Sequence, residues 1–252
     1  IETKEENEFR LTADELREKI TDKTKLLVLP YPNNPTGAIM RREDLEAVAK
    51  VLKDTNIMIA SDEIYSELTY SGKHCSIAEI EGMRERTIVI NGFSKSFAMT
   101  GWRLGFLGGP KEIVSQMLKL HQYAIMSSPT VSQYAAIVAM HSCQKDIDAM
   151  RNEYNIRRRF VVDSFNKLGL KCFAPQGAFY VFPCIKSTGM TSTDFCEKLV
   201  YTKKVAVVPG DAFGECGEGY VRVSYAYSLN HLREAIKRIG EFLEDIKNGN
   251  VQ

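Results

Sequence analysis

Short apolar runs alternate with amphipathic segments in the first part of the chain. Residues 25–29 and 56–60 are apolar-rich runs of strand length, and between them Leu45, Val48 and Leu52 recur at helical spacing. The strands predicted in this part are 25–29, 56–60, 87–90 and 104–107. Strands that are separated by helices predict an α/β fold, with a mainly parallel sheet sandwiched by helices.

The pattern changes after residue 110. Two helical stretches, broken at Ser127-Ser128-Pro129, are followed by a long charged helix at 146–168. The remaining elements are shorter, with strands predicted at 171–174, 178–182, 205–208 and 220–224 and helices at 193–201 and 229–247. This second pattern predicts a smaller α+β domain. We therefore expect a large domain at 1–144 and a C-terminal small domain at 145–252.

Composition and charge exclude several classes of protein. Hydrophobic residues make up 44% and charged residues 26% of the 252, as in ordinary globular domains. The charges of the 33 basic and 32 acidic residues nearly cancel. The net charge therefore creates no electrostatic field that would attract nucleic acid or an anionic membrane. No run approaches the roughly 18 apolar residues of a membrane helix.

The cysteines and the first residue indicate the cellular setting and the completeness of the chain. The six cysteines form no C-x-x-C pair and no cluster with the four histidines, so we expect reduced thiols and no metal site. Together with the lack of a secretory signal, this predicts a cytoplasmic setting. The chain begins at Ile1 without a methionine, which suggests that it is truncated at its N-terminus.

Three polar segments follow three of the predicted strands, at 33–37, 61–65 and 94–96. Ligands of open α/β sheets bind outside the carboxyl ends of the strands, so these segments are expected to share one rim. They supply an amide, a carboxylate, a phenol and an amine, and this set suits pyridoxal 5'-phosphate (PLP).

Each of these groups has a task in PLP chemistry. The amine of Lys95 can form a Schiff base with the PLP aldehyde, and the carboxylate of Asp62 can keep the pyridine nitrogen protonated. Asn34 and Tyr65 can hydrogen-bond the phenolic oxygen of the ring. Arg103 lies eight residues after Lys95, past a glycine that we expect to turn the chain back, and its fork suits a phosphate.

Five ordered motifs give the chain a family resemblance that runs nearly from end to end. They are YPNNPTG (31–37), SDEIYSEL (61–68), FSKSFAMTGWRLGF (93–106), VAVVPGDAFG (205–214) and YVRVSYA (220–226). The chain resembles the fold-type I PLP-dependent aminotransferases of class I and II, which include the aspartate and aromatic aminotransferases. The resemblance implies a large PLP-binding domain, incomplete here, and a smaller C-terminal domain.

The resemblance also implies roles for seven residues. These are the Schiff-base lysine Lys95, the pyridine-nitrogen aspartate Asp62, the phenolate-binding Tyr65, Asn34 for phenolate and substrate carboxylate, Arg103 and Ser94 for the phosphate, and Arg222 for the substrate α-carboxylate. Ser94 matches less well, because the family varies in which hydroxyl near the lysine meets the phosphate. The implied reaction is a ping-pong transfer of an amino group from an amino acid to a 2-oxo acid, by a homodimer.

Other interpretations of the same residues remain open. An isolated Ser-Lys pair is usually a solvated turn, Arg222 can make a structural ion pair, and the arginines 157–159 are expected on a solvated helix face. The phosphate-cradling helix start, the ring-stacking aromatic residue and the partner-subunit tyrosine of the family precede the NPTG loop and are not in this chain. Alternatives are therefore a PLP-dependent C–S lyase or synthase on the same fold, and an inactive fragment or a sensor domain.

Overall fold

The computed structural model describes residues 1–250, and contacts between Cα atoms divide them into two compact units. The large unit comprises residues 1–33, 38–151 and 176–178. The small unit comprises residues 34–37, 152–175 and the described residues from Phe179 onward. The chain thus passes between the units several times, and the short segment 34–37 belongs to the small unit although it lies early in the sequence.

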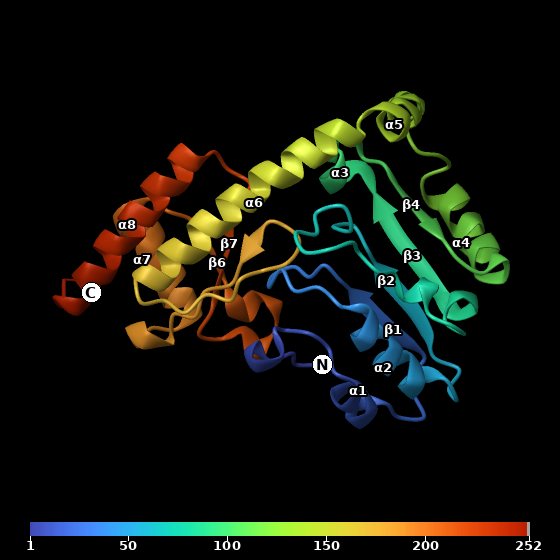
Figure 1. Cartoon of the computed structure of the whole chain (residues 1–252), viewed down its shortest axis with the longest axis horizontal. Helices are drawn as coiled ribbons and strands as arrows, with labels where there is room; N and C mark the ends of the chain where they lie inside the picture. The colour runs from blue at the N-terminus through green and yellow to red at the C-terminus, as the bar shows by residue number, and fades with distance from the viewer. Residues whose placement is uncertain (251–252) are drawn as a thin grey trace. The chain divides into compact units, whose positions relative to one another are not determined.

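The large unit is built on a four-stranded sheet (Figure 1). Its strands are β1 (Leu26–Pro30), β2 (Met58–Asp62), β3 (Thr87–Gly92) and β4 (Gly105–Gly108), in the order β1-β2-β3-β4. The first three are parallel and β4 is antiparallel to β3. The predicted mainly parallel sheet is confirmed, and β4 runs the other way because the chain turns directly back after β3.

The large unit has the predicted helix around Leu45 and the two predicted helical stretches after residue 110, together with two shorter helices. They are α1 (Ala13–Lys19), α2 (Arg42–Leu52), α3 (Phe93–Ser96), α4 (Lys111–Ala124) and α5 (Thr130–Ser142). A capping box formed by Thr12 and Glu15 starts α1, since each side chain binds the backbone N–H of the other residue. The long helix α6 (Gln144–Lys167) begins in the large unit and continues into the small one.

The two faces of the sheet differ in burial. Leu27, Leu29 and Ile59 are buried, and the pairing of Leu27 with Ile59 places them on one face. On the opposite face Leu26 and Val28 are 50% and 58% exposed. Side chains of a strand alternate between faces, so Asp62, four residues after Met58, belongs to this second face at the carboxyl end of β2.

The small unit packs two helices with a three-stranded antiparallel sheet in the order β5-β7-β6. The strands are β5 (Tyr180–Val181), β6 (Val208–Pro209) and β7 (Val221–Ser224), and the helices are α7 (Ser192–Lys203) and α8 (Leu229–Lys247). Phe195 of α7 and Phe242 of α8 are buried, and their rings meet edge to face at 5.2 Å between centroids. This contact joins the two helices.

Some predicted small-unit elements are wrong. Residues 171–174 form no strand. The backbone N–H of Cys172, which a neighbouring strand would otherwise bind, donates instead to the side-chain Oδ1 of Asn166 at 3.0 Å. The strand expected at 205–208 is confined to Val208–Pro209. No helix within residues 1–250 is long and apolar enough to cross a membrane.

Candidate cofactor and substrate site

The carboxyl end of β2 carries the predicted aspartate and tyrosine. Asp62 is the last residue of β2 and pairs with Ile90 of β3 and Pro30 of β1. Its Oδ1 accepts a hydrogen bond from Ile64 N at 3.2 Å, which closes a tight turn directly after the strand. Tyr65 follows in this turn and is buried. The turn therefore holds a carboxylate and a phenol three residues apart at the end of a central strand.

Lys95 lies in the loop that follows the neighbouring strand. Phe93 N donates to Leu104 O at 3.2 Å, so residues 93–104 form a loop that is closed at its base. Lys95 belongs to the single turn of α3 at the start of this loop. Because β2 and β3 are parallel neighbours, Asp62 and Lys95 extend from the same edge of the sheet.

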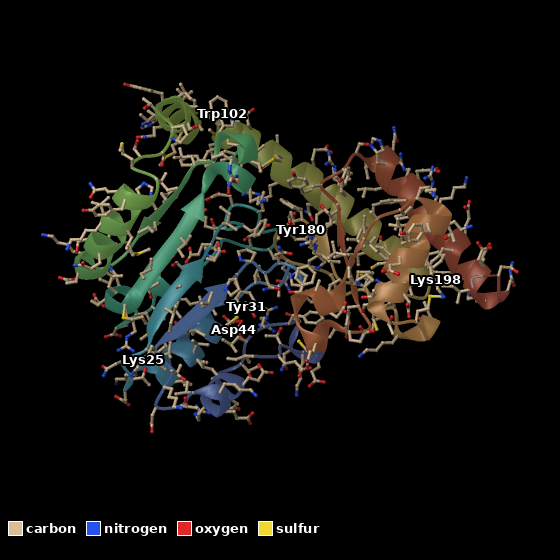
Figure 2. The ribbon with its side chains drawn as sticks, turned by 180° about the vertical axis from the view of Figure 1, so that it is seen from behind. Lys25, Tyr31, Asp44, Trp102, Tyr180 and Lys198 are labelled. Carbon is tan, nitrogen blue, oxygen red and sulfur yellow. The ribbon has the colours of Figure 1, made fainter. Side chains whose placement is uncertain are left out.

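Hydrogen bonds between backbone and side chains fix the shape of the Lys95 loop. Thr100 Oγ1 donates to Ser94 O at 2.8 Å, across the loop. Ser132 Oγ, from α5, donates to Trp102 O at 2.7 Å. Figure 2 labels Trp102 in this loop, beyond the end of β3. The loop is thus held both by its own residues and by the helix beside it.

Two glycines bring the Asp62 turn and the Lys95 loop together. A Cβ added to Gly92 would lie 3.1 Å from the Cα of Gly105 and 3.2 Å from Cδ1 of Ile64. Ile64 belongs to the turn after β2. Ser66 follows this turn, and Asn91 Nδ2 of β3 donates a hydrogen bond to its Oγ at 3.0 Å. Glycine at position 92 lets the two segments approach without displacing these neighbours.

Arg103 closes the loop in a conformation that the sequence did not reveal. Its backbone lies in the left-handed region with φ 52°, as does that of Ala98, whereas Gly101 has no positive φ. Gly101 lies in the 3-10 turn Thr100–Trp102, and the left-handed residues flank that turn. A left-handed residue other than glycine costs about 1–2 kcal/mol. The exposed Arg103 side chain donates from Nη1 to Thr100 O at 2.9 Å.

The small unit contains the other two predicted site residues, Asn34 and Arg222, in direct contact. Arg222 Nη1 donates to Asn34 Oδ1 at 2.8 Å. The guanidinium lies 4.6 Å from the ring centroid of Tyr180 and 5.0 Å from that of Phe213. Cation–π contacts from two rings hold its plane in a defined orientation. The pattern of the sequence did not indicate either aromatic partner.

The Nε atom of Arg222 is buried and has no hydrogen-bond partner among the described residues. A buried donor without an acceptor costs about 1–3 kcal/mol, so such a group usually meets a ligand or water. Nε and a terminal nitrogen of guanidinium together match the two oxygens of a carboxylate. The arrangement around Arg222 therefore suits a carboxylate ligand.

The large unit provides donors and acceptors that suit PLP. An amine on α3, a carboxylate at the end of β2, and the hydroxyl and guanidinium groups of the Lys95 loop match the aldehyde, pyridine nitrogen and phosphate of that cofactor. Ser96, the residue after Lys95 in α3, was missed by sequence reasoning: its hydroxyl is buried and has no hydrogen-bond partner in the described residues. Within residues 1–250, no group of three His, Cys, Asp or Glu side chains could hold a metal ion.

The arginine run of α6 differs from its prediction. Arg157 is only 21% exposed at its side chain, and its guanidinium lies 5.6 Å from the ring centroid of Tyr154. Arg158 donates from Nη1 to Pro175 O at 2.9 Å. Of the three arginines, only Arg159 is exposed, so the predicted solvated face is wrong for the first two.

Comparisons with known proteins agree with this arrangement. The family described as "Aminotransferase class I and II" matches residues 1–239. The chain is 47% identical to an aspartate aminotransferase of Pyrococcus abyssi over 250 residues, which cover 98% of this chain and 64% of that protein. It is also 47% identical to aromatic-amino-acid aminotransferase 2 of Thermococcus litoralis, again with 98% and 64% coverage.

A solved structure shows the same fold. The chain matches the crystal structure of an aromatic aminotransferase from Pyrococcus horikoshii with a TM-score of 0.95 and 46% identity, over 97% of this chain and 66% of that one. The chain spans about 64% of the length of the curated relatives it matches. Sequence and fold agree across nearly all of this chain, which belongs to the PLP-dependent family of class I and II aminotransferases.

Proposed function

We propose that the protein is a PLP-dependent aminotransferase that moves an amino group from an amino acid to a 2-oxo acid. The observation that carries the proposal is the position of Asp62 and Lys95 at the ends of two neighbouring parallel strands. A carboxylate and an amine at one rim can hold opposite sides of a pyridine ring. The similarity to aspartate and aromatic aminotransferases supports the same reaction class.

Each residue of the large unit has a separate task in this proposal. When bound, PLP supplies an aldehyde carbon that condenses with amines and a ring that withdraws electrons from the substrate α-carbon. Lys95 would hold the cofactor through its amine, and as a free amine it would take the proton from the substrate α-carbon as general base and give it back as general acid. Asp62 holds the proton on the ring nitrogen. Arg103 and Ser94 bind the phosphate.

The remaining residues orient the ring and the substrate. Tyr65 donates a hydrogen bond to the phenolic oxygen of the ring, and Asn34 shares this task. Arg222 pairs with the α-carboxylate of the amino acid through Nε and a terminal nitrogen, and its contact with Asn34 fixes which edge of the guanidinium is available. Holding the carboxylate restricts the orientation of the α-carbon of the bound amino acid.

A transfer assay tests this function. The protein is incubated with PLP, 2-oxoglutarate and, in turn, each amino acid other than glutamate, and glutamate formation is measured beside Lys95→Ala and the control Lys111→Ala. We expect transfer from at least one amino acid, loss of at least about 1000-fold in Lys95→Ala, and no change in the control. Absence of transfer from every donor would refute the proposal. Release of pyruvate and ammonia instead would identify a C–S lyase.

We further propose that the protein acts as a homodimer in the cytoplasm. The exposed residues Val131, Tyr134 and Val138 line one side of α5, where they are 71%, 69% and 60% exposed. An apolar stripe of this kind is typical of a protein interface. The six cysteines have no disulfide partner, which suits a reducing compartment.

A further inference from the structure

Glu63, the residue after Asp62, is a buried carboxylate with a full set of donors. The residue is 4% exposed. Its Oε1 accepts from Ser61 Oγ at 3.0 Å and from Ser76 Oγ at 2.6 Å, and its Oε2 lies 2.8 Å from His74 Nε2. All four residues belong to the large unit. Two of these partners, His74 and Ser76, lie 11 and 13 residues after Glu63 in the chain.

The donors keep this carboxyl group ionised. Burial alone would raise the pKa of Glu63, but the hydrogen bonds from His74, Ser76 and Ser61 lower it below its usual value. The other polar groups close to this cluster are Cys75, Arg42 and Glu79. Burying a charge is costly, and an apolar side chain at position 63 would fill the space at less cost. The carboxylate therefore suggests a need for fixed geometry.

The Glu63 cluster anchors the turn that carries Asp62 and Tyr65. Glu63 N donates to Ile90 O at 2.8 Å, and Ser66 N donates to Glu63 O at 2.9 Å. Asp62 precedes Glu63 directly, and Tyr65 follows it by two residues. The backbone and the side chain of Glu63 are both hydrogen-bonded. Glu63 therefore restricts the positions of Asp62 and Tyr65 on either side of it.

The other end of the cluster is equally fixed. Ser76 starts a short 3-10 helix (Ile77–Glu79), where its Oγ accepts from Ala78 N at 3.2 Å and its N donates to Glu79 Oε1 at 3.3 Å. The hydroxyl of Ser76 thus links this helix start to the Glu63 carboxylate. His74 makes a second link two residues earlier. The turn after β2 is consequently tied to the start of this 3-10 helix.

We propose that Glu63 and His74 are a positioning pair that holds Asp62 and Tyr65 in place for the pyridine nitrogen and the phenolic oxygen of the cofactor. This inference rests on the proposed PLP-dependent function. The pair does not touch the cofactor in this account. It acts through the backbone of the turn, as residues behind a ligand-binding shell commonly do.

The test compares Glu63→Gln and His74→Phe with two reference variants. His74→Gln keeps an N–H donor near the Nε2 position, and Glu67→Gln removes an exposed carboxylate from the same segment. The readouts are the dissociation constant for PLP and the midpoint pH of the absorbance change of the bound cofactor. Urea unfolding of the cofactor-free proteins provides the stability of each variant.

We expect Glu63→Gln and His74→Phe to raise the dissociation constant about tenfold and to shift the absorbance midpoint. His74→Gln should restore most of the affinity, and Glu67→Gln should match the wild type. A merely structural role would change the unfolding curve and leave the midpoint in place. If Glu63→Gln does not fold, Ser76→Ala removes one donor only and is expected to shift the same midpoint by less.

The possible failures are distinguishable. A wild-type protein with no absorbance band from bound PLP would overturn the proposed function, and the inference with it. A wild-type band together with unchanged affinity and midpoint in Glu63→Gln and His74→Phe would overturn the inference alone. Loss of affinity in His74→Gln equal to that in His74→Phe would show that the donor is not what matters, and would also contradict it.

Discussion

At the scale of single residues, Arg222 illustrates how neighbours prepare a charged group for a ligand. Its plane is fixed by Tyr180 and Phe213, one terminal nitrogen is bound to Asn34, and Nε is left as a buried donor. A lysine at this position would keep the charge and lose the planar pair of donors.

This arrangement predicts a selective defect in Arg222→Lys. We expect the KM for the amino-acid substrate to rise about 30-fold, which corresponds to the loss of one charge-assisted hydrogen bond of about 2 kcal/mol. The absorbance of the bound cofactor should not change. Steady-state kinetics with the exposed Arg233→Lys as the control checks this prediction. An unchanged KM in Arg222→Lys would show that another group binds the carboxylate.

The buried Glu63 carboxylate gives a pH dependence with a defined sign. Its pKa in the folded protein is lower than the ordinary value of 4.5, so its contribution to stability is fully present above that value. The contribution is lost as the pH falls through the folded-state pKa. Urea unfolding from pH 7 to acid should therefore show that wild type and Glu63→Gln differ most at neutral pH and converge below 4.5. A constant difference would contradict this.

Residues differ in how far the sequence predicts their roles. The seven predicted site residues stand within ordered motifs, whose residue types and order indicate their chemistry. The partners of Glu63 could not be predicted, because His74 and Ser76 approach it only through the path of an irregular segment. The left-handed backbone of Arg103 was equally hidden, since arginine has no preference for that region.

At the scale of elements, the close approach of Gly92 to Gly105 joins the strand ends that carry the site. Gly92→Ala would place a Cβ 3.2 Å from both Leu104 O and Ile64 Cδ1, so we expect a loss of about 1–3 kcal/mol in the free energy of unfolding and weaker PLP binding. Gly101→Ala is the matched control in the same loop, because a Cβ there meets nothing within 4 Å. Chemical denaturation of both variants measures the difference, and equal stability would refute the packing argument.

Long elements were predicted better than short ones. Helix α8 was expected at 229–247 and forms there, because its apolar residues recur over five turns. The strands of the small unit have two to four residues, too few for a period to appear, and side chains such as that of Asn166 replace the ladder at 171–174. Strand β4 is antiparallel to β3, with Gly92 paired to Gly105. The hydrophobic pattern within either strand does not reveal this direction.

At the scale of the whole molecule, the exposed stripe of α5 bears on the oligomeric state. Tyr134→Lys places a charge in the middle of the stripe, so we expect dimers to dissociate at concentrations at which the wild type remains dimeric. Gln133→Lys on the same helix is exposed and lies outside the stripe. Sedimentation velocity over a range of concentrations provides the test. A wild type that is monomeric throughout would contradict the proposed homodimer.

For the whole molecule we propose that Lys95 carries PLP in an aminotransferase. Borohydride reduction of the PLP-treated protein, followed by peptide mass mapping, tests it most directly, because reduction makes the lysine–cofactor bond permanent. We predict a stoichiometric phosphopyridoxyl group on the peptide that contains Lys95, and its loss when an amino-acid donor is added before reduction. A label on other lysines alone, or one that no amino acid can displace, would show that Lys95 does not carry the cofactor of a transfer reaction.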